Sequence, residues 1–462
     1  MAPDGLMISV SGVRGRVGES LTPEVVGGFA AAFGAWSLSR SASDVIVLGR
    51  DSRVSGPMFH RAVIAALQSV GAHTVDLGVV PTPTVQLEVE HRGAAGGLAI
   101  TASHNPIEWN ALKFIGAAGL FLTAAEGQAM RAFADAGVPR AEWNGLGDVV
   151  QDEGAIDRHI AAILALPQID VPAIRARGFH VALDCVRGAG GPIMTRLLGE
   201  LGCRVTAINL DADGLFPRPP EPVAENLGDL ERLVAESGAD VGLATDPDVD
   251  RLAIVDERGR AIGEDYTLAL AAGVALKRQT GVVVTNLSTS RVVDDVVSAA
   301  GGRVIRAPVG EVNVASRMQT EGAVIGGEGN GGVILPDLHL GRDAPLAAAM
   351  TLQMLALEGR ALSDVVAAYP RYVILKDKLN RPDAALDTVY KALRSAFADA
   401  EVDEQDGLRL SWSDRWVHVR PSGTEPIVRV IAEAPTIELA RTLIARSRAP
   451  LDALAAQPTL TT

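Results

Sequence analysis

A repeated succession of short apolar, strand-like runs, polar or glycine-rich loops and helix-period segments constrains this chain most strongly. The first helical segment starts at Thr22-Pro23-Glu24, an N-cap followed by proline, after which Val25, Val26 and Phe29 recur at helical spacing. Strands that alternate with helices are typical of α/β domains with parallel sheets. The strands predicted for the first such domain are Val45–Leu48, His73–Leu77 and Gly97–Ile100.

The same succession restarts after the polar segments 148–154 and 256–259, and beyond Tyr369-Pro370 the runs become more antiparallel in character. The strands predicted for these later parts are His180–Leu183, Arg204–Ile208, Val241–Ala244 and Leu252–Val255, then Gly281–Thr285, Arg303–Ala307 and Ala323–Gly326, then Tyr372–Leu375, Leu408–Trp412, Trp416–Val419 and Val428–Ala432. We therefore predict an α/β protein with three related mixed α/β domains and a C-terminal α+β domain. The expected boundaries are 1–153, 154–258, 259–369 and 370–462.

The balance of charge excludes several classes of partner. The chain has 56 acidic and 42 basic residues, a formal net charge of −14 and only 4% aromatic residues. Nucleic acids and acidic membranes bind to positive faces, and stacked bases need aromatic platforms, so we expect neither partner. Cys185 and Cys203 are too few for a disulfide framework, and no signal peptide or membrane span is recognisable. These features predict a soluble, cytoplasmic protein with two buried free thiols.

Each of the three α/β domains has one predicted strand that ends in an unusual polar loop, and ligands of open α/β sheets bind at such carboxyl ends. In the first domain, Ile100-Thr-Ala-Ser-His-Asn-Pro106 presents Ser103 on a small-residue turn that Pro106 stiffens. An exposed hydroxyl on a rigid turn suits a covalent phosphoryl carrier, although an ordinary serine–asparagine turn has the same composition. The loop lacks the Gly-x-Ser-x-Gly pattern of an esterase.

In the second domain, Asp246, Asp248 and Asp250 alternate along one loop. An extended chain would place their carboxylates on one side about 6–7 Å apart, and like charges that close favour a cation between them. Oxygen ligands select Mg²⁺ or Ca²⁺; a solvated acidic loop is the alternative. An EF-hand is excluded, although Glu257 would be its twelfth residue, because Arg251 replaces the required glycine. Arg251 could itself contact a phosphate.

In the third domain, Ile325-Gly-Gly-Glu-Gly-Asn-Gly-Gly332 formally matches Gly-x-Gly-x-x-Gly after a strand. A dinucleotide site is not predicted, because no helix opens at Gly332 and no ribose-binding acid follows at the right distance. Glu328 and Asn330 instead suit contacts with neighbouring sugar hydroxyls. A flexible glycine turn is the alternative.

The C-terminal domain carries Arg420-Pro-Ser-Gly-Thr-Glu-Pro426, which combines a guanidinium, two hydroxyls and glycine backbone N–H groups. That collection suits a phosphate monoester, and a simple hairpin loop is the alternative. Two weaker arginine sites are Ser11-Gly-Val-Arg-Gly15, which contains Arg14, and the segment 49–56, which contains Arg50 and Arg53. Such loops are more often structural ion-pair sites than phosphate sites.

Taken together, the four loops resemble those of the α-D-phosphohexomutase family. Thr101–Pro106 is similar to its phosphoserine loop, Asp246–Arg251 to its metal loop, Gly327–Gly332 to its sugar-binding loop and Arg420–Pro426 to its phosphate-binding loop. They occur in the family's order and at domain-scale spacing, so the resemblance covers essentially the whole chain. It implies four domains around a central cleft.

The resemblance also implies roles for individual residues. Ser103 would be the phosphoserine, with Asp246, Asp248 and Asp250 joining its phosphate as ligands of one Mg²⁺. Lys113 would be the general acid and base, with a pKa lowered by neighbouring arginines if it is to act as a base. The further catalytic residues would be Arg14 and His104, and the substrate-binding residues would be Arg251, Glu328, Asn330, Arg420, Ser422, Gly423, Thr424 and Arg429.

The chain departs from the family in its sugar loop. Many members have serine and a terminal histidine where this chain has Asn330 and Gly332. If that histidine assists proton transfer elsewhere, His339 or His104 would have to replace it here. The segment before Ser11 also differs from the usual Phe-Gly-Thr. These differences bear on sugar specificity more than on the chemistry.

The resemblance implies an intramolecular phosphotransferase that interconverts hexose 6-phosphate and hexose 1-phosphate through a 1,6-bisphosphate. The sugar loop and Phe216-Pro-Arg-Pro-Pro-Glu221 most resemble archaeal-type phosphoglucosamine mutases. Glucose or glucosamine 1,6-bisphosphate would then be the activator, and the protein would be a monomer or homodimer. Phosphoglucomutase or phosphomannomutase activity is the alternative within the family. A Mg²⁺-dependent sugar phosphatase and a non-catalytic sugar-phosphate binding protein are alternatives of other classes.

Overall fold

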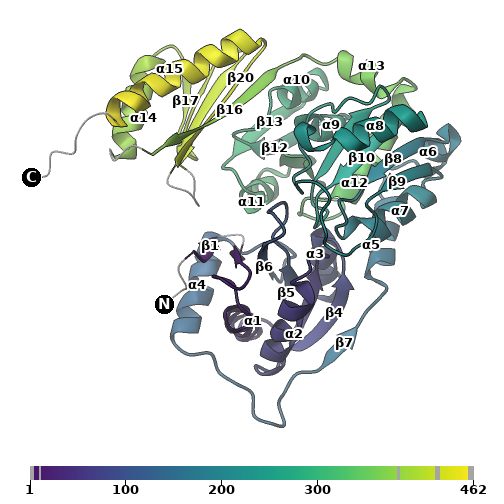
Figure 1. Cartoon of the computed structure of the whole chain (residues 1–462), viewed down its shortest axis with the longest axis vertical. Helices are drawn as coiled ribbons and strands as arrows, with labels where there is room; N and C mark the ends of the chain where they lie inside the picture. Colours follow the sequence, from purple (N-terminus) through teal and green to yellow (C-terminus); the bar gives the residue numbers. More distant parts are fainter. Residues whose placement is uncertain (1–4, 10–11, 382–384, 422–426, 456–462) are drawn as a thin grey trace, which may run out of the picture.

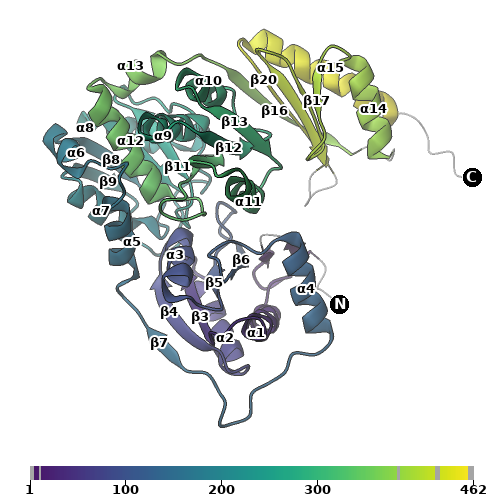
Figure 2. The same ribbon diagram turned by 180° about the vertical axis from the view of Figure 1, so that it is seen from behind.

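The structure, a computed structural model, describes residues 5–9, 12–381, 385–421 and 427–455. These residues form four sheets, each with its own helices, in the order along the chain that the sequence predicts (Figure 1). Seen from both sides, the second and third units lie together, and the C-terminal unit adjoins the third and is set apart from the first (Figures 1 and 2). The predicted class, three mixed α/β domains and a C-terminal α+β domain, is confirmed.

The first unit is built on a seven-stranded sheet of order β1-β2-β6-β5-β3-β4-β7. The strands β5, β3, β4 and β7 run parallel, whereas β6, β2 and β1 are antiparallel to their neighbours. The elements of this unit are β1 (Met7–Ser9), β2 (Gly12–Arg16), α1 (Pro23–Leu38), β3 (Val45–Arg50), α2 (Gly56–Gln68), β4 (His73–Val79), α3 (Thr82–Arg92), β5 (Gly96–Ile100), β6 (Trp109–Gly116), α4 (Ala124–Asp135) and β7 (Val149–Gln151).

The second and third units share one topology. Each has a four-stranded sheet with three parallel strands and an antiparallel edge strand, in the orders β9-β8-β10-β11 and β13-β12-β14-β15. The second contains α5 (Ala155–Leu164), α6 (Val171–Arg177), β8 (His180–Asp184), α7 (Gly190–Glu200), β9 (Arg204–Ile208), α8 (Gly228–Ser237), β10 (Val241–Thr245), β11 (Leu252–Asp256) and a short 3₁₀ helix (Ala224–Asn226). The third contains α9 (Asp265–Arg278), β12 (Val282–Asn286), α10 (Val292–Ala299), β13 (Arg303–Ala307), α11 (Glu311–Glu321), β14 (Ile325–Glu328), β15 (Gly332–Ile334), α12 (Ala344–Glu358) and α13 (Leu362–Ala367).

The C-terminal unit has a fully antiparallel five-stranded sheet of order β16-β20-β19-β18-β17 and a hydrophobic core of its own. Its elements are β16 (Val373–Asn380), α14 (Leu386–Ala396), β17 (Glu401–Asp403), β18 (Leu408–Ser411), β19 (Trp416–Pro421), β20 (Ile427–Ala434) and α15 (Ile437–Ala455). The alternating burial of β20 is what an antiparallel sheet with one covered face requires.

Two strands that the sequence did not predict are important for the site. Strand β6 turns back antiparallel to β5 directly after the Ser103 loop and carries Lys113. Strand β15 turns back against β14 after the glycine-rich loop, where no helix was expected. Cys203 is a partial correction, because it is only half-buried, whereas Cys185 is fully buried as expected.

Helix α12 joins the cores of the second and third units. Its residues from Ala344 to Leu355 are all buried, because the helix is apolar on every side and contacts α9 of the third unit and α5, α6 and α7 of the second. One continuous core therefore spans these units and reaches into the first. Among the described residues, no helix is long and apolar enough to cross a bilayer.

The start of α12 is held by a buried carboxylate that links the first three units. Asp343 caps the helix by accepting from the backbone N–H of Leu346, and its Oδ2 lies 2.7 Å from His159 Nε2 and 3.0 Å from His339 Nε2. Thr84 of the first unit lies against His159 Nδ1 at 2.8 Å. Because the Gly341 N–H donates to His339 Nδ1, the Nε2–H of His339 faces the carboxylate. Burial alone would raise the pKa of Asp343, but the two histidines outweigh it and hold the pKa below its ordinary range.

This arrangement predicts a pH-dependent cost for Asp343→Asn. Asparagine keeps the helix cap but loses the charge between the histidines, so we expect a loss of about 2 kcal/mol in the free energy of unfolding near pH 7. Since the folded pKa of Asp343 is depressed, its contribution is complete above the unfolded pKa of about 3.9 and disappears as the pH falls through the lower folded pKa. Urea unfolding of both proteins near pH 7 and below about pH 4 measures the difference. A difference that does not shrink in acid contradicts the assignment.

Candidate active site

Ser103 lies in a strained turn at the carboxyl end of β5. Its φ angle is 50°, in the left-handed region that non-glycine residues rarely adopt, and the residue is 3% exposed. Thr101 fixes the turn, since its hydroxyl accepts from the Ser103 N–H and donates to Asp51 Oδ2 at 2.7 Å. Strain of this kind persists only where the surroundings enforce it.

Arg53 supplies that enforcement. Its guanidinium is fully buried and donates to the backbone carbonyls of Ser103, Asn105, Pro106 and Trp109 at 2.6–2.9 Å, and its Nε lies 3.0 Å from Asp51 Oδ2. A planar fork with five N–H donors can satisfy such a set, whereas a lysine cannot. The arginine pair of segment 49–56 is therefore structural at Arg53, which has no free donor for a phosphate.

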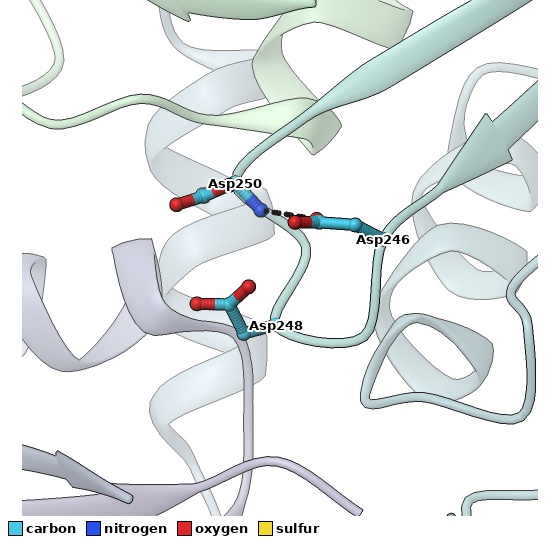
Figure 3. Close-up of side chains that lie close together, drawn as sticks. All are labelled: Asp246, Asp248 and Asp250. Atoms are coloured by element: carbon cyan, nitrogen blue, oxygen red, sulfur yellow. Dashed lines mark hydrogen bonds between the residues drawn. The ribbon is translucent and has the colours of Figure 1, made fainter. Parts of the chain in front are cut away.

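The three aspartates lie on the turn between β10 and β11, and their side chains lie close together (Figure 3). They are 0–1% exposed, and one carboxylate oxygen of each lies within 4.8 Å of the others. Asp246 Oδ1 accepts from the backbone N–H groups of Asp250 and Arg251, which closes the turn. Val249 between them has a φ of 63°, so this turn is also strained.

Cations from two other units partly neutralise the triad. Lys113 Nζ of the first unit lies 2.7 Å from Asp248 Oδ2 and 3.6 Å from Asp250 Oδ2, and Arg342 Nη2 of the third unit lies 2.6 Å from Asp250 Oδ2. Burial raises the pKa of all three carboxyls. Lys113 and a hydrogen bond from Thr82 outweigh it for Asp248, and Arg342, Lys113 and Arg251 outweigh it for Asp250, so both of these pKa values are lowered overall. For Asp246, burial and the charges of Asp250 and Asp248 prevail, and its pKa rises well above the usual range.

The triad retains the ligand atoms that a divalent cation needs. Among the described residues, Asp248 Oδ1 and Asp250 Oδ1 are buried without any hydrogen-bond partner, and the hydroxyl of Ser103 lies 3.1 Å from Asp246 Oδ2. Buried carboxylate oxygens without partners are costly unless something else binds them. Hard oxygen ligands on three aspartates beside a hydroxyl suit a hard divalent ion. The EF-hand remains excluded, since Glu257 bonds instead to Ser363 in α13's first turn.

The glycine-rich loop places Glu328 in the interior. Its Oε1 accepts from Asn286 Nδ2 at 2.8 Å and from the Gly310 N–H at 2.9 Å, and its Oε2 lies 2.7 Å from Arg342 Nη1. Asn330 Nδ2 lies 3.5 Å from the same Oε2. A carboxylate has about four lone-pair sites, so these contacts leave one site on Oε2, opposite only the long Asn330 contact, for a sugar hydroxyl.

Gly332 is the position where the resemblance leads one to expect histidine. A Cβ atom there would lie 2.3 Å from Cδ of Arg342, so the arginine stem fills the space a side chain would need. Of the two proposed replacements, His339 is 2% exposed and bonded to Asp343. His104 lies beside the site, with Nδ1 3.3 Å from Ser103 Oγ. The charge of Arg251, together with burial and Arg14, lowers the pKa of His104 well below its usual value.

A cleft of about 800 Å³ lies beside the site, between His104 and the C-terminal unit. It is lined by His104 from the first unit, Asp265 and Ser290 from the third and Arg429 from β20. Burial raises the pKa of Asp265 to about 7, a feature that the sequence did not signal.

The remaining predicted residues are placed as follows. Arg14 Nη1 lies 2.5 Å from Asn105 Oδ1, and its pKa is lowered by burial. Arg251 lies 3.4 Å from Glu221, which also lines the cleft. Arg420 on β19 lies opposite Arg429 on β20 in the antiparallel ladder, and its side chain donates to Asp406 Oδ2 at 3.0 Å. Ser422, Gly423 and Thr424 lie outside the described residues.

Comparison with known proteins explains this assembly. Four successive segments match the domains of one family, described as phosphoglucomutase/phosphomannomutase alpha/beta/alpha domains I, II and III and C-terminal domain, over residues 6–138, 157–259, 263–372 and 373–449. The chain belongs to this family. It is thus a phosphohexomutase, and the resemblance noted from its loops is confirmed.

Relatives match over nearly the whole chain. A "Probable phosphoglucosamine mutase" of Methanopyrus kandleri and a "Phosphoglucomutase/phosphomannomutase" of Thermococcus kodakarensis are each 39% identical over 443 residues, which is 95% of this chain and 96% of theirs. A crystal structure of a phosphoglucomutase/phosphomannomutase family protein from Burkholderia thailandensis is 27% identical, with a TM-score of 0.85 over 97% of this chain and 99% of that one.

The phosphohexomutase contains functional neighbours that the sequence analysis missed. Arg342 and Glu311 lie next to the site but no motif in the sequence marks them, whereas Asp51 lies in the segment 49–56, where only the arginines were considered. The dipeptide Arg342-Asp343 directly before an apolar helical segment is a weak sign of a buried ion-pair site, since buried charges need partners.

The geometry of the triad predicts that Asp246→Asn weakens metal binding without lowering the stability of the metal-free protein. The amide removes one carboxylate from a crowded group, so we expect metal-free stability to be unchanged or higher and Mn²⁺ affinity to fall by about a hundredfold. Titration with Mn²⁺, followed by electron paramagnetic resonance, and thermal unfolding in chelator give the two values. Undiminished Mn²⁺ binding would show that the ion does not use this carboxylate.

Proposed function

We propose that the enzyme interconverts glucosamine 6-phosphate and glucosamine 1-phosphate through a phosphoserine at Ser103 and a 1,6-bisphosphate intermediate. The proposal rests chiefly on one observation, the Ser103 hydroxyl held 3.1 Å from Asp246 in a buried, strained turn beside Lys113 and the other two aspartates. A nucleophile fixed against a cation site is what stepwise phosphoryl transfer requires.

Asp246, Asp248 and Asp250 would hold one Mg²⁺, which neutralises charge on a migrating phosphoryl group. The chain's own residues supply the rest. Arg14 and Arg251 place positive charge around the phosphoryl group that Ser103 carries. The C-terminal unit anchors the phosphate that does not react, through Arg420, Arg429 and the loop 422–424. Such a remote contact orients the sugar for transfer.

Lys113 enters the reaction as the proton donor. Burial and the charge of Arg342 lower its pKa, but the charges of Asp248 and Asp250 outweigh them, so the pKa is raised overall and the expected net lowering by arginines was wrong. In the proposed cycle the Lys113 ammonium protonates the serine oxygen as it loses its phosphate, and the neutral amine takes the proton back when Ser103 is rephosphorylated. His104, whose pKa is depressed, is the neutral base for the sugar hydroxyl in the first transfer, and it returns that proton to the sugar oxygen that loses its phosphate in the second.

The choice of sugar is supported by the relative from Methanopyrus kandleri, which is named as a phosphoglucosamine mutase. The equally similar Thermococcus kodakarensis protein is named phosphoglucomutase/phosphomannomutase, so glucose and mannose phosphates are the second candidates. Glu328 and Asn330 would contact sugar hydroxyls. Steady-state kinetics with the three hexose 6-phosphates and a trace of 1,6-bisphosphate test this choice; a higher kcat/KM for glucose or mannose 6-phosphate would overturn it.

Ser103→Ala is expected to abolish isomerisation while the thermal unfolding midpoint changes little, because the hydroxyl makes few contacts beyond Asp246 and His104. Intact-mass analysis after incubation with the bisphosphate should show one added phosphate on the wild type and none on the variant. Release of inorganic phosphate at the rate of substrate loss would identify a phosphatase instead. A variant that retains full mutase activity would eliminate the phosphoserine mechanism.

A further inference from the structure

Arg342 is a buried charge near the site that is paired with three carboxylates, and none of the four loop motifs includes it. It lies between β15 and α12, is 7% exposed, and contacts carboxylates on three separate segments. Its Nη2 lies 2.6 Å from Asp250 Oδ2, its Nη1 2.7 Å from Glu328 Oε2 and its Nε 3.0 Å from Glu311 Oε2. The guanidinium therefore ties the metal loop of the second unit to the glycine-rich loop of the third.

The contact geometry uses the shape of the guanidinium as well as its charge. Each of its three nitrogens bonds to a different carboxylate, so the three acids are held at fixed separations. A lysine ammonium is a single point on a flexible stem and cannot hold three partners in one plane. Asp250 Oδ2 accepts from Arg342, whereas its Oδ1 is left without a hydrogen bond among the described residues and lies 3.7 Å from Arg251 Nε.

Glu328 depends on the same contact. Its Oε1 is fixed by Asn286 and the Gly310 backbone, but its Oε2 has only the long Asn330 contact at 3.5 Å besides Arg342 among the described residues. Removing the guanidinium would free that oxygen to rotate away from the triad. Gly332 packs against the arginine stem, so the loop itself is shaped around Arg342.

We propose that Arg342 is a positioning residue for sugar recognition, which fixes the Glu328 carboxylate to Asp250 so that a hexose ring binds at a set distance from Ser103. The inference rests on the proposed function for its ligand, a hexose phosphate. It assigns to Arg342 no contact with the reacting atoms. Its effect reaches the ring of the sugar through Glu328 and leaves the phosphate contacts of the C-terminal unit unchanged.

Calorimetric titration of the full-length protein tests this directly. Arg342→Lys and Arg342→Gln are each titrated with glucosamine 6-phosphate and with glycerol 3-phosphate, which has a phosphate but no ring. Since a charge-assisted hydrogen bond contributes about 1.5–3 kcal/mol, we expect both variants to bind the hexose phosphate at least about tenfold more weakly and the ringless phosphate within about twofold of the wild type. Arg360→Gln, at an exposed pair with Glu358, is the matched control and should change neither affinity.

Two results would overturn the proposal. If Arg342→Lys binds the hexose phosphate as the wild type does, the charge alone matters and the fork does not position Glu328. If both ligands weaken equally, the residue supports the fold without reading the ring. Breaking a buried ion cluster can prevent folding, so Gly332→Ala is a second variant: its Cβ would meet Arg342 Cδ at 2.3 Å and displace the stem while keeping every charge.

For Gly332→Ala the same ring-selective loss is expected, and equal affinities for wild type and variant contradict the proposal. The test of Arg342 and the test of the proposed function can fail independently. A wild-type protein that binds glucosamine 6-phosphate without isomerising it overturns the proposed function alone, and the ring-selective comparison still decides the role of Arg342. A wild-type protein that binds no hexose phosphate overturns both.

Discussion

Three carboxylates buried on one turn are the constraint on which the rest of this structure depends. Like charges repel strongly where water is excluded, and an isolated buried carboxylate would rather protonate than stay charged. Asp248 and Asp250 remain ionised because Lys113 reaches them from the first unit and Arg342 from the third. The turn between β10 and β11 therefore brings the three α/β units together for electrostatic reasons, and the same turn leaves oxygen atoms for a cation.

The phosphoserine turn depends on a second buried charge. Arg53 replaces water as the donor to four carbonyl oxygens of the segment from Ser103 to Trp109, so the turn keeps a left-handed Ser103 that would otherwise relax. Asp51 balances the guanidinium and accepts from Thr101. A rigid nucleophile close to a charged triad is pre-organised, and pre-organisation removes reorganisation from the energetic cost of phosphoryl transfer.

The four-unit architecture was predicted from the alternation of strand and helix patterns along the chain. The Ser103 loop and the aspartate triad were predicted because each is a motif of a few consecutive residues. Lys113 was found only through the family resemblance, because β6 was not among the predicted strands. The direction of its pKa shift was mispredicted, since the result depends on whether buried carboxylates or arginines lie nearer, which only the tertiary structure decides. Arg342 and Glu311 lie far apart in sequence from the triad they serve, so no local pattern marks them.

The C-terminal unit has its own core, and the segment 286–291 links it to the sugar loop. Asn286 donates to Glu328, and the Thr289 hydroxyl accepts from the Gly329 N–H at 3.0 Å, while Ser290 and the Arg291 N–H bond to the buried Glu433 of β20. Glu433 also accepts from Trp416 Nε1, which fixes it within the C-terminal sheet. The segment 286–291 thus bonds both to the loop that contains Glu328 and to the strand that carries Arg429. The loop proposed to contact the sugar and the strand proposed to contact the phosphate are therefore held in place by the same segment.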